Sequence, residues 1–383
     1  MSEPLLLTPG PTIVPPAVRE ALGRPMDHHR TKEFQAVLKE VAEGLKKVFG
    51  TAQEVMILTS SGTGAMEAAA ANLLCAGDEA VVIRGGKFGE RWGEICEAFG
   101  VKFTPVDPAW GKPLDLKGLE QALKAHPKAK ALFATLCETS TGVVFDVRGI
   151  RKAIASAGSQ ALLVVDAISG LGADSFAMDE YGVDVTVSGS QKGFMLPPGL
   201  AFIALSPRAW EAAAKTKSPR YYYDLNLARK AWAETDTPFT PAISLIVGLK
   251  ESLKIILSKG VEVFVAGHRA NAEALRTAAE KMGLEIFTEP ACSSNAVTAI
   301  KVPDGVDGKE LLKRVRAQHN IVIAGGQGKE LAGKVIRIAT MGAVGPKEIQ
   351  AGLTAVGQVL AEMGWIPRGR APSELKGARS LHG

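Results

Sequence analysis

The sequence predicts an α/β fold with a mainly parallel central sheet. Six short apolar runs, several without alternation between apolar and polar residues, are separated by helical stretches. Such runs are typical of strands buried on both faces, and helical stretches between them favour crossover connections. At 383 residues the chain exceeds the ~250–300 residues at which one core stops growing, so two domains are expected. The runs are residues 54–59, 80–84, 131–136, 161–166, 184–188 and 200–205.

The elements on either side of these runs differ in pattern. An amphipathic helix is expected over residues 33–49, where apolar residues recur three and four positions apart and Gly50 follows. After about residue 240, long helical stretches give way to strand-like runs, which predicts a second, smaller α+β domain. The helical stretches are residues 241–257 and 261–282, and the strand-like runs are residues 295–302 and 334–340.

Composition excludes several classes of protein. Lys and Arg number 45 against 40 Asp and Glu, and no arginine run or basic aromatic stripe is present, so nucleic acid is not an expected partner. No apolar stretch approaches the ~18 residues of a membrane span. The cysteines lie far apart without a C-x-x-C pair or metal-ligand spacing, which favours a reducing, cytoplasmic setting. They are Cys75, Cys96, Cys137 and Cys292.

Polar residues follow three of the predicted strands, at the edge where parallel sheets bind ligands. The first run leads into a small-residue turn from Ser60 to Gly64 and an alanine-rich helix, whose first N–H groups favour an anion. Asp166 ends the fourth run, and Lys192 lies in a Ser/Gly segment beyond the fifth. The plainer alternatives are a strand-to-helix turn, a helix cap and a surface lysine.

Together these three features match the requirements of pyridoxal 5′-phosphate. This cofactor needs an anion site for its phosphate, a carboxylate that keeps the ring nitrogen protonated, and a lysine that forms a Schiff base with its aldehyde. Desolvation at the end of a strand would lower the pKa of Lys192 and make its amine a nucleophile towards carbonyls. The combination therefore predicts a site for this cofactor.

Motifs spread over nearly the whole chain carry a family resemblance. They are TPGPTIVPP, SSGTGAMEAA, GGKFGERWGE, ETSTGV, VVDAISGLGA, SGSQKGFMLPPGLAF, TPFTPAIS and GKVIRIATMG. The chain resembles the class V aminotransferases of fold type I, most closely the alanine–glyoxylate, serine–glyoxylate and serine–pyruvate branch. That branch includes bacterial members labelled as a soluble hydrogenase subunit. The resemblance implies a large domain with a seven-stranded, mainly parallel sheet and a smaller C-terminal α+β domain.

The resemblance also implies roles for single residues. Lys192 is expected to be the Schiff-base lysine, Asp166 the partner of the ring nitrogen, and Arg337 the binder of the substrate carboxylate. Gly10, in the TPGP turn, is expected to line the substrate pocket. Thr237 and Thr240 are expected to reach the phosphate of a neighbouring subunit, which implies a homodimer with shared sites. Further cofactor contacts are expected at Ser61, Gly62, Thr63, Phe88, Thr139 and Gln191.

Three positions depart from the mammalian pattern of this family. Tryptophan stands there in place of Phe88, histidine in place of Thr63, and tyrosine in place of Thr237. Trp92, one helical turn after Phe88, is a second candidate for stacking on the cofactor ring. The shorter Thr237 binds the phosphate itself or leaves that contact to a backbone group or a water.

The expected organisation of the chain has four parts. Residues 1–20 pack with the small domain and the substrate pocket, and residues 21–255 form the large cofactor-binding domain. Residues 256–366 form the small domain, and residues 367–383 are a polar tail.

Other polar and aromatic clusters have less specific interpretations. A surface or interface role is favoured over a site role for His28, His29 and Arg30. Dimer packing or core is favoured for the three tyrosines at 221–223, and a buried structural role for Cys137.

The sequence therefore predicts an enzyme that moves the amino group of alanine or serine to glyoxylate, or to pyruvate, by a ping-pong mechanism. Lys192 would serve as general base and then general acid. Two alternatives stay open. One is a cysteine desulfurase-like lyase, with Cys292 as the single candidate nucleophile in the C-terminal half. The other is a non-catalytic partner subunit, as the hydrogenase label implies.

Overall fold

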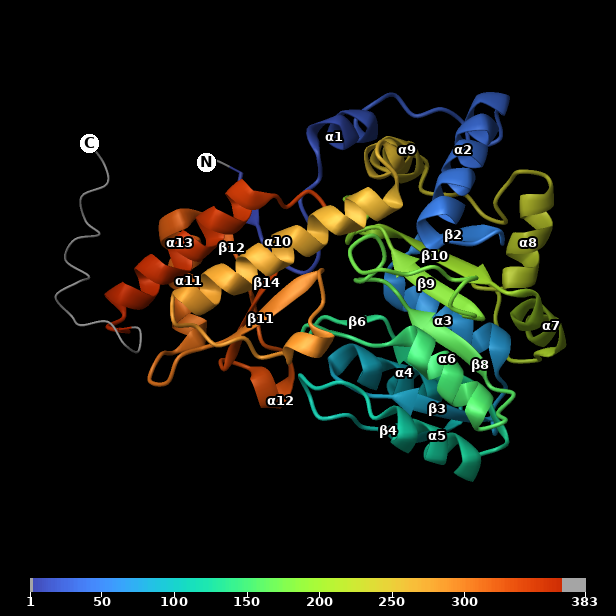
Figure 1. Cartoon of the computed structure of the whole chain (residues 1–383). Coiled ribbons are helices and arrows are strands. Elements are labelled where there is room, and N and C mark those ends of the chain that lie inside the picture. The colour runs from blue at the N-terminus through green and yellow to red at the C-terminus, as the bar shows by residue number, and fades with distance from the viewer. Residues whose placement is uncertain (1–2, 367–383) are drawn as a thin grey trace.

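The computed structural model describes residues 3–366, and a seven-stranded sheet forms the centre of its larger part (Figure 1). The strand order is β2-β10-β9-β8-β5-β3-β4, and only β10 runs antiparallel to its neighbours. The predicted mainly parallel α/β sheet is confirmed. The strands are β2 (Val55–Ser60), β3 (Glu79–Ile83), β4 (Lys102–Val106), β5 (Ala129–Thr135), β8 (Leu162–Asp166), β9 (Val185–Gly189) and β10 (Gly199–Leu205).

Helices cover both faces of this sheet because successive strand residues point to opposite sides. Within β8, Leu163 and Val165 pack into one core, whereas Leu162 and Val164 pack into the other. The first core is covered by α2 (Lys32–Phe49), α5 (Leu116–Ala125), α6 (Val147–Ser156) and α9 (Ile243–Leu257). The second is covered by α3 (Gly62–Leu73), α4 (Lys87–Ala98), α7 (Pro207–Lys215) and α8 (Leu225–Ala233).

A smaller α+β unit is built from the C-terminal part of the chain and its N-terminal strand. The sheet β11-β14-β13 is antiparallel, and β1 pairs in parallel with β12. Its helices enclose a third core. The strands are β1 (Leu5–Leu6), β11 (Val297–Lys301), β12 (Ile321–Val322), β13 (Ala324–Gly325) and β14 (Val335–Ala339), and the helices are α10 (Val261–Lys281), α11 (Gly308–His319), α12 (Gly328–Leu331) and α13 (Pro346–Glu362).

Short elements join these two parts. They are α1 (Pro16–Leu22), the hairpin of β6 (Cys137–Glu138) and β7 (Val143–Val144), and a 3-10 turn at Pro290–Cys292. The predicted domain boundaries stay a prediction, and the predicted polar tail at 367–383 lies outside the described residues. Within residues 3–366, no helix is both long enough and apolar enough to cross a membrane.

The parallel order places several predicted site residues at one sheet edge. The carboxyl ends of β2, β5, β8 and β9 share this edge, and Thr135 lies opposite Asp166 in the register of β5 and β8. The loops that leave these ends carry Ser61 and Lys192. The fold therefore brings together residues that lie more than a hundred positions apart in the sequence.

Candidate active site

Lys192 lies in the loop that follows β9, and its side chain is buried with 8% exposure. Its Nζ donates a hydrogen bond to the backbone carbonyl of Pro9. Burial lowers the pKa of Lys192 to about 8, against the opposing attraction of Cys137 and Asp166. The amine is therefore much closer to its neutral, nucleophilic form at physiological pH than a surface lysine is.

The N-terminal turn packs directly on this lysine. Gly10 has a φ of +110°, and a Cβ added there would lie 2.6 Å from both Cε and Nζ of Lys192. The side chain of Thr12 donates to the backbone carbonyl of Lys192 at 3.0 Å, and its N–H donates to the carbonyl of Gln191 at 3.2 Å. The absence of a side chain at position 10 is what lets the turn approach the amine.

Asp166 is the last residue of β8 and is buried with 3% exposure. Its Oδ1 accepts a hydrogen bond from the N–H of Ile168 at 2.8 Å, so the turn interpretation accounts for one oxygen. Burial raises the pKa of Asp166 to about 7, and the positive charges of Lys192 and Arg91 oppose that rise. A cationic ring nitrogen beside the second oxygen would stabilise the carboxylate and lower this pKa again.

The small-residue turn forms the N-terminus of α3 beside Asp166. Ser61 is the N-cap residue, yet its hydroxyl makes no capping hydrogen bond. Gly62 packs so closely that an added Cβ would lie 2.5 Å from Cδ1 of Ile168. The first N–H groups of the helix therefore have no side-chain cap, and the helix dipole favours an anion beside them.

Phe88, on α4, contacts the site, whereas Trp92 does not. Nζ of Lys192 lies 6.0 Å from the ring centroid of Phe88. Trp92 has no exposed surface and stacks on Phe133 at 4.5 Å inside the core of the sheet. The suggestion that Trp92 stacks on the cofactor ring in place of Phe88 is therefore wrong, because the Trp92 ring packs in the core against Phe133 of β5.

Arg337, on β14, is buried with 4% exposure and donates to two backbone carbonyls. Nε donates to Gly325 and Nη1 donates to Thr139, both at 2.9 Å. Desolvation lowers the pKa of Arg337 to about 10, while the nearby charge of Glu138 raises it. No carboxylate lies within 4.0 Å of the guanidinium in the described part of the chain. An internal salt bridge, which is the plainer explanation of a buried arginine, therefore has no partner there.

Thr237 and Thr240 lie in the loop between α8 and α9. Oγ1 of Thr237 donates to the carbonyl of Phe239 at 2.8 Å, and Thr240 is exposed. Neither threonine forms a hydrogen bond with Lys192, Asp166 or the α3 N-terminus across residues 3–366. Their role in a neighbouring subunit stays a prediction.

The tyrosine segment lies beside these threonines. Tyr221 is 74% exposed and Tyr222 is 45% exposed, so neither is a core residue. Tyr223 is half-buried, and its hydroxyl lies 2.8 Å from Oγ of Ser60 at the end of β2. Arg30, from the His-His-Arg cluster, is exposed and lies 3.8 Å from Asp236. These positions agree with a surface or interface location for both clusters.

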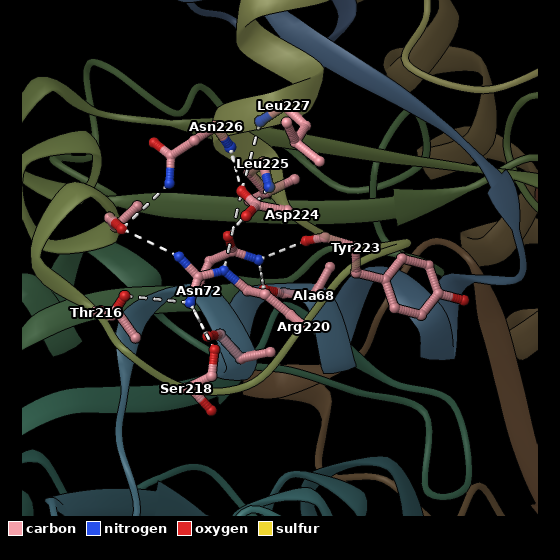
Figure 2. A network of polar contacts seen from close by, with 12 residues as sticks. Ala68, Asn72, Thr216, Ser218, Arg220, Tyr223, Asp224, Leu225, Asn226 and Leu227 are labelled. Atoms are coloured by element: carbon pink, nitrogen blue, oxygen red, sulfur yellow. Dashed lines mark hydrogen bonds and ion pairs between the residues drawn. The ribbon is translucent and has the colours of Figure 1, made fainter.

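A polar network fixes the tyrosine segment to α3 (Figure 2). Asn72, buried in α3, donates to the carbonyl of Tyr223 at 2.6 Å and accepts from the N–H of Leu225 at 3.1 Å. Arg220 donates to the carbonyls of Ala71, Thr216 and Ser218. The segment before α8 is thus held on the helix whose first turn is the predicted anion site.

Sequence reasoning missed two charged residues at the site. Arg91 donates to Oγ1 of Thr63 at 3.2 Å, and its guanidinium lies 5.0 Å from the ring centroid of Phe88. A spacing of three residues from Phe88 on a helix was the available signal. Glu138 is fully buried beside Phe88, and no local sequence pattern indicates that contact.

Cys137 and Cys292, the two cysteines for which a specific role was predicted, are both buried. Cys137 is 2% exposed, and its Sγ lies 3.1 Å from Oγ of Ser294, which confirms the buried location. Cys292 is 4% exposed in the 3-10 turn, and burial raises its thiol pKa. A buried thiol of raised pKa is poorly suited to act as a mobile nucleophile.

The residues present fit pyridoxal 5′-phosphate. Lys192 and Asp166 supply a buried amine and a buried carboxylate at one sheet edge. Two buried polar atoms at predicted cofactor contacts, Oγ1 of Thr139 and Oε1 of Gln191, have no hydrogen-bond partner among the described residues. Buried polar atoms are normally paired, so both are available to a bound group.

Comparisons with known proteins agree with this site. The chain matches the family Aminotransferase class-V over residues 11–344, and it therefore belongs to the class V aminotransferases. It is 41% identical to the soluble hydrogenase small subunit of Synechococcus sp., over 94% of each chain. It is 37% identical to the L-aspartate–glyoxylate aminotransferase of Paracoccus denitrificans, over 94% of this chain and 91% of that protein.

Two further likenesses concern glyoxylate enzymes. The serine–glyoxylate aminotransferase of Hyphomicrobium methylovorum is 38% identical, over 94% of this chain and 90% of that protein. The crystal structure of alanine–glyoxylate aminotransferase from Nostoc sp. gives a TM-score of 0.90 at 32% identity, over 94% and 96% of the two chains. The protein is an aminotransferase that depends on pyridoxal 5′-phosphate, as its sequence predicts.

Proposed function

We propose that this enzyme transfers the amino group of alanine or serine to glyoxylate, or to pyruvate, by a ping-pong mechanism. The observation that carries the proposal is the buried guanidinium of Arg337, which has no carboxylate partner within residues 3–366 and lies near enough to Lys192 for its charge to lower the pKa of that lysine. Glyoxylate appears in the names of three of the similar proteins above, which supports it as the acceptor.

Each residue of the site contributes a separate step. Arg337 binds the α-carboxylate of the amino acid through the donors that its two backbone contacts leave free. The neutral amine of Lys192 takes a proton from Cα of the amino acid as general base, and it would then donate that proton as general acid to the aldehyde carbon of the bound cofactor. Asp166 keeps a negative charge beside the ring nitrogen. Pyridoxal 5′-phosphate, when bound, supplies the electron sink for this chemistry.

The N-terminal turn supports small substrates. Because the turn at Gly10 packs against the amine of Lys192, the space next to the reacting atoms is bounded by backbone on that side. A methyl or hydroxymethyl side chain, as in alanine or serine, suits such a boundary.

We further propose a cytoplasmic homodimer. All four cysteines are free, which suits a reducing compartment. The exposed tyrosines beside Thr237 supply an apolar surface next to the residues that are predicted to reach the partner subunit.

A panel of donors and acceptors tests the substrate proposal. Alanine, serine, aspartate and cysteine are each offered with glyoxylate and with pyruvate, and both keto-acid and amino-acid products are measured. The proposal expects the highest kcat/KM for alanine or serine. Higher kcat/KM with aspartate would contradict the proposed donors, and sulfide from cysteine would support the lyase alternative. Absence of turnover with every pair would support the non-catalytic subunit.

Replacement of Arg337 by alanine tests the carboxylate site. We expect the variant to fold and bind cofactor but to lose about 2–4 kcal/mol of amino-acid binding, because a charge-assisted contact is removed. The measurement is a titration of the cofactor absorbance with alanine and serine. Arg276→Ala is the matched control, since Arg276 is a half-buried arginine that likewise donates to a backbone carbonyl, that of Ser294 at 3.0 Å. Unchanged affinity in folded Arg337→Ala would remove this residue from the site.

A further inference from the structure

The carboxylate of Glu138 is fully buried at the edge of the site and has no role in the chemistry proposed above. It belongs to β6, in the short hairpin that follows β5. Its Oε2 accepts from the N–H groups of Phe88 at 3.1 Å and Gly89 at 2.9 Å. Its Oε1 accepts from the N–H of Ser140 at 3.2 Å and from the hydroxyl of Ser140 at 2.5 Å. All four contacts are donors, as a carboxylate anion requires.

These hydrogen bonds cap α4 from a distant part of the chain. The N-cap residue of α4 is Gly86, which has no side chain to bond the free N–H groups. The N–H of Lys87 instead donates to Oγ of Ser140 at 3.0 Å, and Glu138 takes the next two N–H groups. A Cβ at Gly86 would lie 2.4 Å from Oγ of Ser140 and 2.6 Å from Cδ of Glu138, so the fit is close.

The first consequence concerns the aromatic ring at the site. Phe88 is in the first turn of α4, and Glu138 bonds its backbone directly. The ring centroid of Phe88 lies 6.0 Å from Nζ of Lys192. The position of the ring relative to the amine therefore depends on the Glu138 carboxylate.

The second consequence concerns the substrate arginine. Thr139 directly follows Glu138, and its carbonyl accepts from Nη1 of Arg337 at 2.9 Å. The negative charge of Glu138 raises the pKa of Arg337 without forming an ion pair, and it is the sole charged group that does so among the described residues. This leaves the guanidinium charged and its remaining donors free for a ligand.

We propose that Glu138 is a positioning residue that holds the Phe88 ring and the Arg337 guanidinium in a fixed relation to Lys192. The inference rests on the proposed function, because it takes Arg337 as the site for the substrate carboxylate. The buried carboxylate of Glu138 then fixes the Phe88 ring, against which the cofactor is expected to pack. It also fixes the Arg337 guanidinium, which is expected to bind the carboxylate of the amino acid.

Glu138→Gln is the variant that tests this inference, because it keeps the side-chain shape and removes the charge. We expect a weaker visible circular dichroism signal per bound cofactor and a rise of about 10-fold or more in KM for the amino donor. The binding of propionate, a carboxylate without an amino group, is measured from the cofactor absorbance. Its dissociation constant is expected to rise by a similar factor.

Asp146→Asn is the matched control. Asp146 also caps a helix of the large domain, since its Oδ1 accepts from the N–H of Gly149 at 2.9 Å at the start of α6. Both variants are expected to lower the melting temperature, but only Glu138→Gln is expected to change propionate binding and the dichroism. Lowered melting temperature in Glu138→Gln, with both other readouts unchanged, would show that Glu138 only caps the helix and would overturn the inference.

A second variant and measurements on the wild-type protein complete the test. If Glu138→Gln does not fold, Ser140→Ala removes one donor to the carboxylate and is expected to shift the same readouts in the same direction. Unchanged propionate binding in folded Ser140→Ala would then overturn it. Wild-type protein that binds propionate but transaminates neither alanine nor serine would overturn the proposed substrates alone. Failure of the wild-type protein to bind propionate would overturn the carboxylate site and this inference together.

Discussion

Burial shifts the pKa values of Lys192 and Asp166 in opposite directions, so that the two values become similar. It lowers the pKa of Lys192 to about 8 and raises that of Asp166 to about 7, so neither charge is strongly favoured in the protein without its cofactor. Each pKa shift reflects a charge held in a poorly solvated place. A ligand with a carbonyl group for the amine and a cationic nitrogen for the carboxylate would relieve both, which is why these residues fit the cofactor.

Asp166→Asn is predicted to separate folding from cofactor chemistry. The variant keeps the oxygen that bonds Ile168 but loses the charge, so we expect weaker cofactor binding and a fall in kcat of about 100-fold or more. The pKa of folded Asp166 is raised, so the folded protein without cofactor binds its proton more tightly than the unfolded chain does. Wild-type stability should therefore fall as pH rises from about 4 to 7, and the variant should lose the part of this decline that Asp166 causes. Melting curves across that pH range measure it.

Asp174→Asn is the control for that experiment. Asp174 is equally buried, and burial raises its pKa to about 6, but its oxygens accept from Ser294 and from the N–H of Asn295. Loss of its charge should change the pH dependence of stability without changing cofactor affinity. Near-normal turnover in Asp166→Asn would return Asp166 to a purely structural turn role.

Single residues differ in how far the sequence could predict them. Lys192 and Asp166 follow apolar strands, so a general rule about parallel sheets finds them. Glu138 could not be found, since it bonds N–H groups about 50 residues earlier in the chain. The choice between Phe88 and Trp92 depends on which face of α4 meets the sheet, and helical spacing alone does not decide it.

At the scale of elements, six strands of the central sheet were predicted, including β2 at one edge, and β4 at the other edge was missed. The six apolar runs correspond to β2, β3, β5, β8, β9 and β10. The missed strand, β4, lies at the sheet edge, contains Pro105 and is partly exposed along its length. An edge strand can tolerate proline and polar residues because one side needs no strand partner, and β4 accordingly lacks the apolar run by which the other six strands were found.

Asn72→Ala is predicted to loosen the tyrosine segment from α3 (Figure 2). The carbonyl of Tyr223 and the N–H of Leu225 would lose their partner, which should lower the free energy of unfolding by about 2–4 kcal/mol. Because Tyr223 also contacts Ser60 beside the anion site, cofactor affinity should fall several-fold. Denaturant unfolding and fluorescence titration with the cofactor measure the two effects.

Asn226→Ala serves as the control for that variant. Asn226 donates to the carbonyl of Ala213 on α7 rather than to α3. We expect a smaller loss of stability and no change in cofactor affinity. Equal cofactor affinity in Asn72→Ala and wild type would show that the network stabilises the fold without positioning the anion site.

At the scale of the whole molecule, the N-terminal segment ties the two parts together. β1 pairs with β12 in the C-terminal unit, and the next residues continue to the turn on Lys192. Periodicity predicted both units, but not this pairing, because strand partners hundreds of residues apart leave no local pattern. The position of the N-terminal turn near the site was instead predicted from the resemblance to a family.

A patch of partly exposed aromatic residues lies on the surface of the single chain. Tyr222 stacks on Phe239 at 5.1 Å with 9° between the rings, and Tyr221 lies 5.5 Å from the same ring. This patch adjoins Thr237 and continues through Tyr223 to the anion site. Exposed aromatic clusters of this kind are typical of protein interfaces.

Tyr221→Glu is predicted to weaken the proposed dimer and, through it, cofactor binding. A carboxylate in the patch would be desolvated when two chains meet, so the dimer dissociation constant should rise by about 10-fold or more. Cofactor affinity should fall in parallel at low protein concentration and recover at high concentration, since each site is expected to take Thr237 and Thr240 from the partner. Sedimentation equilibrium and cofactor titration over a range of protein concentrations measure this. Val263→Glu, at an exposed apolar position on α10, is the control and should change neither quantity. A wild-type monomer with full cofactor affinity would contradict the shared site.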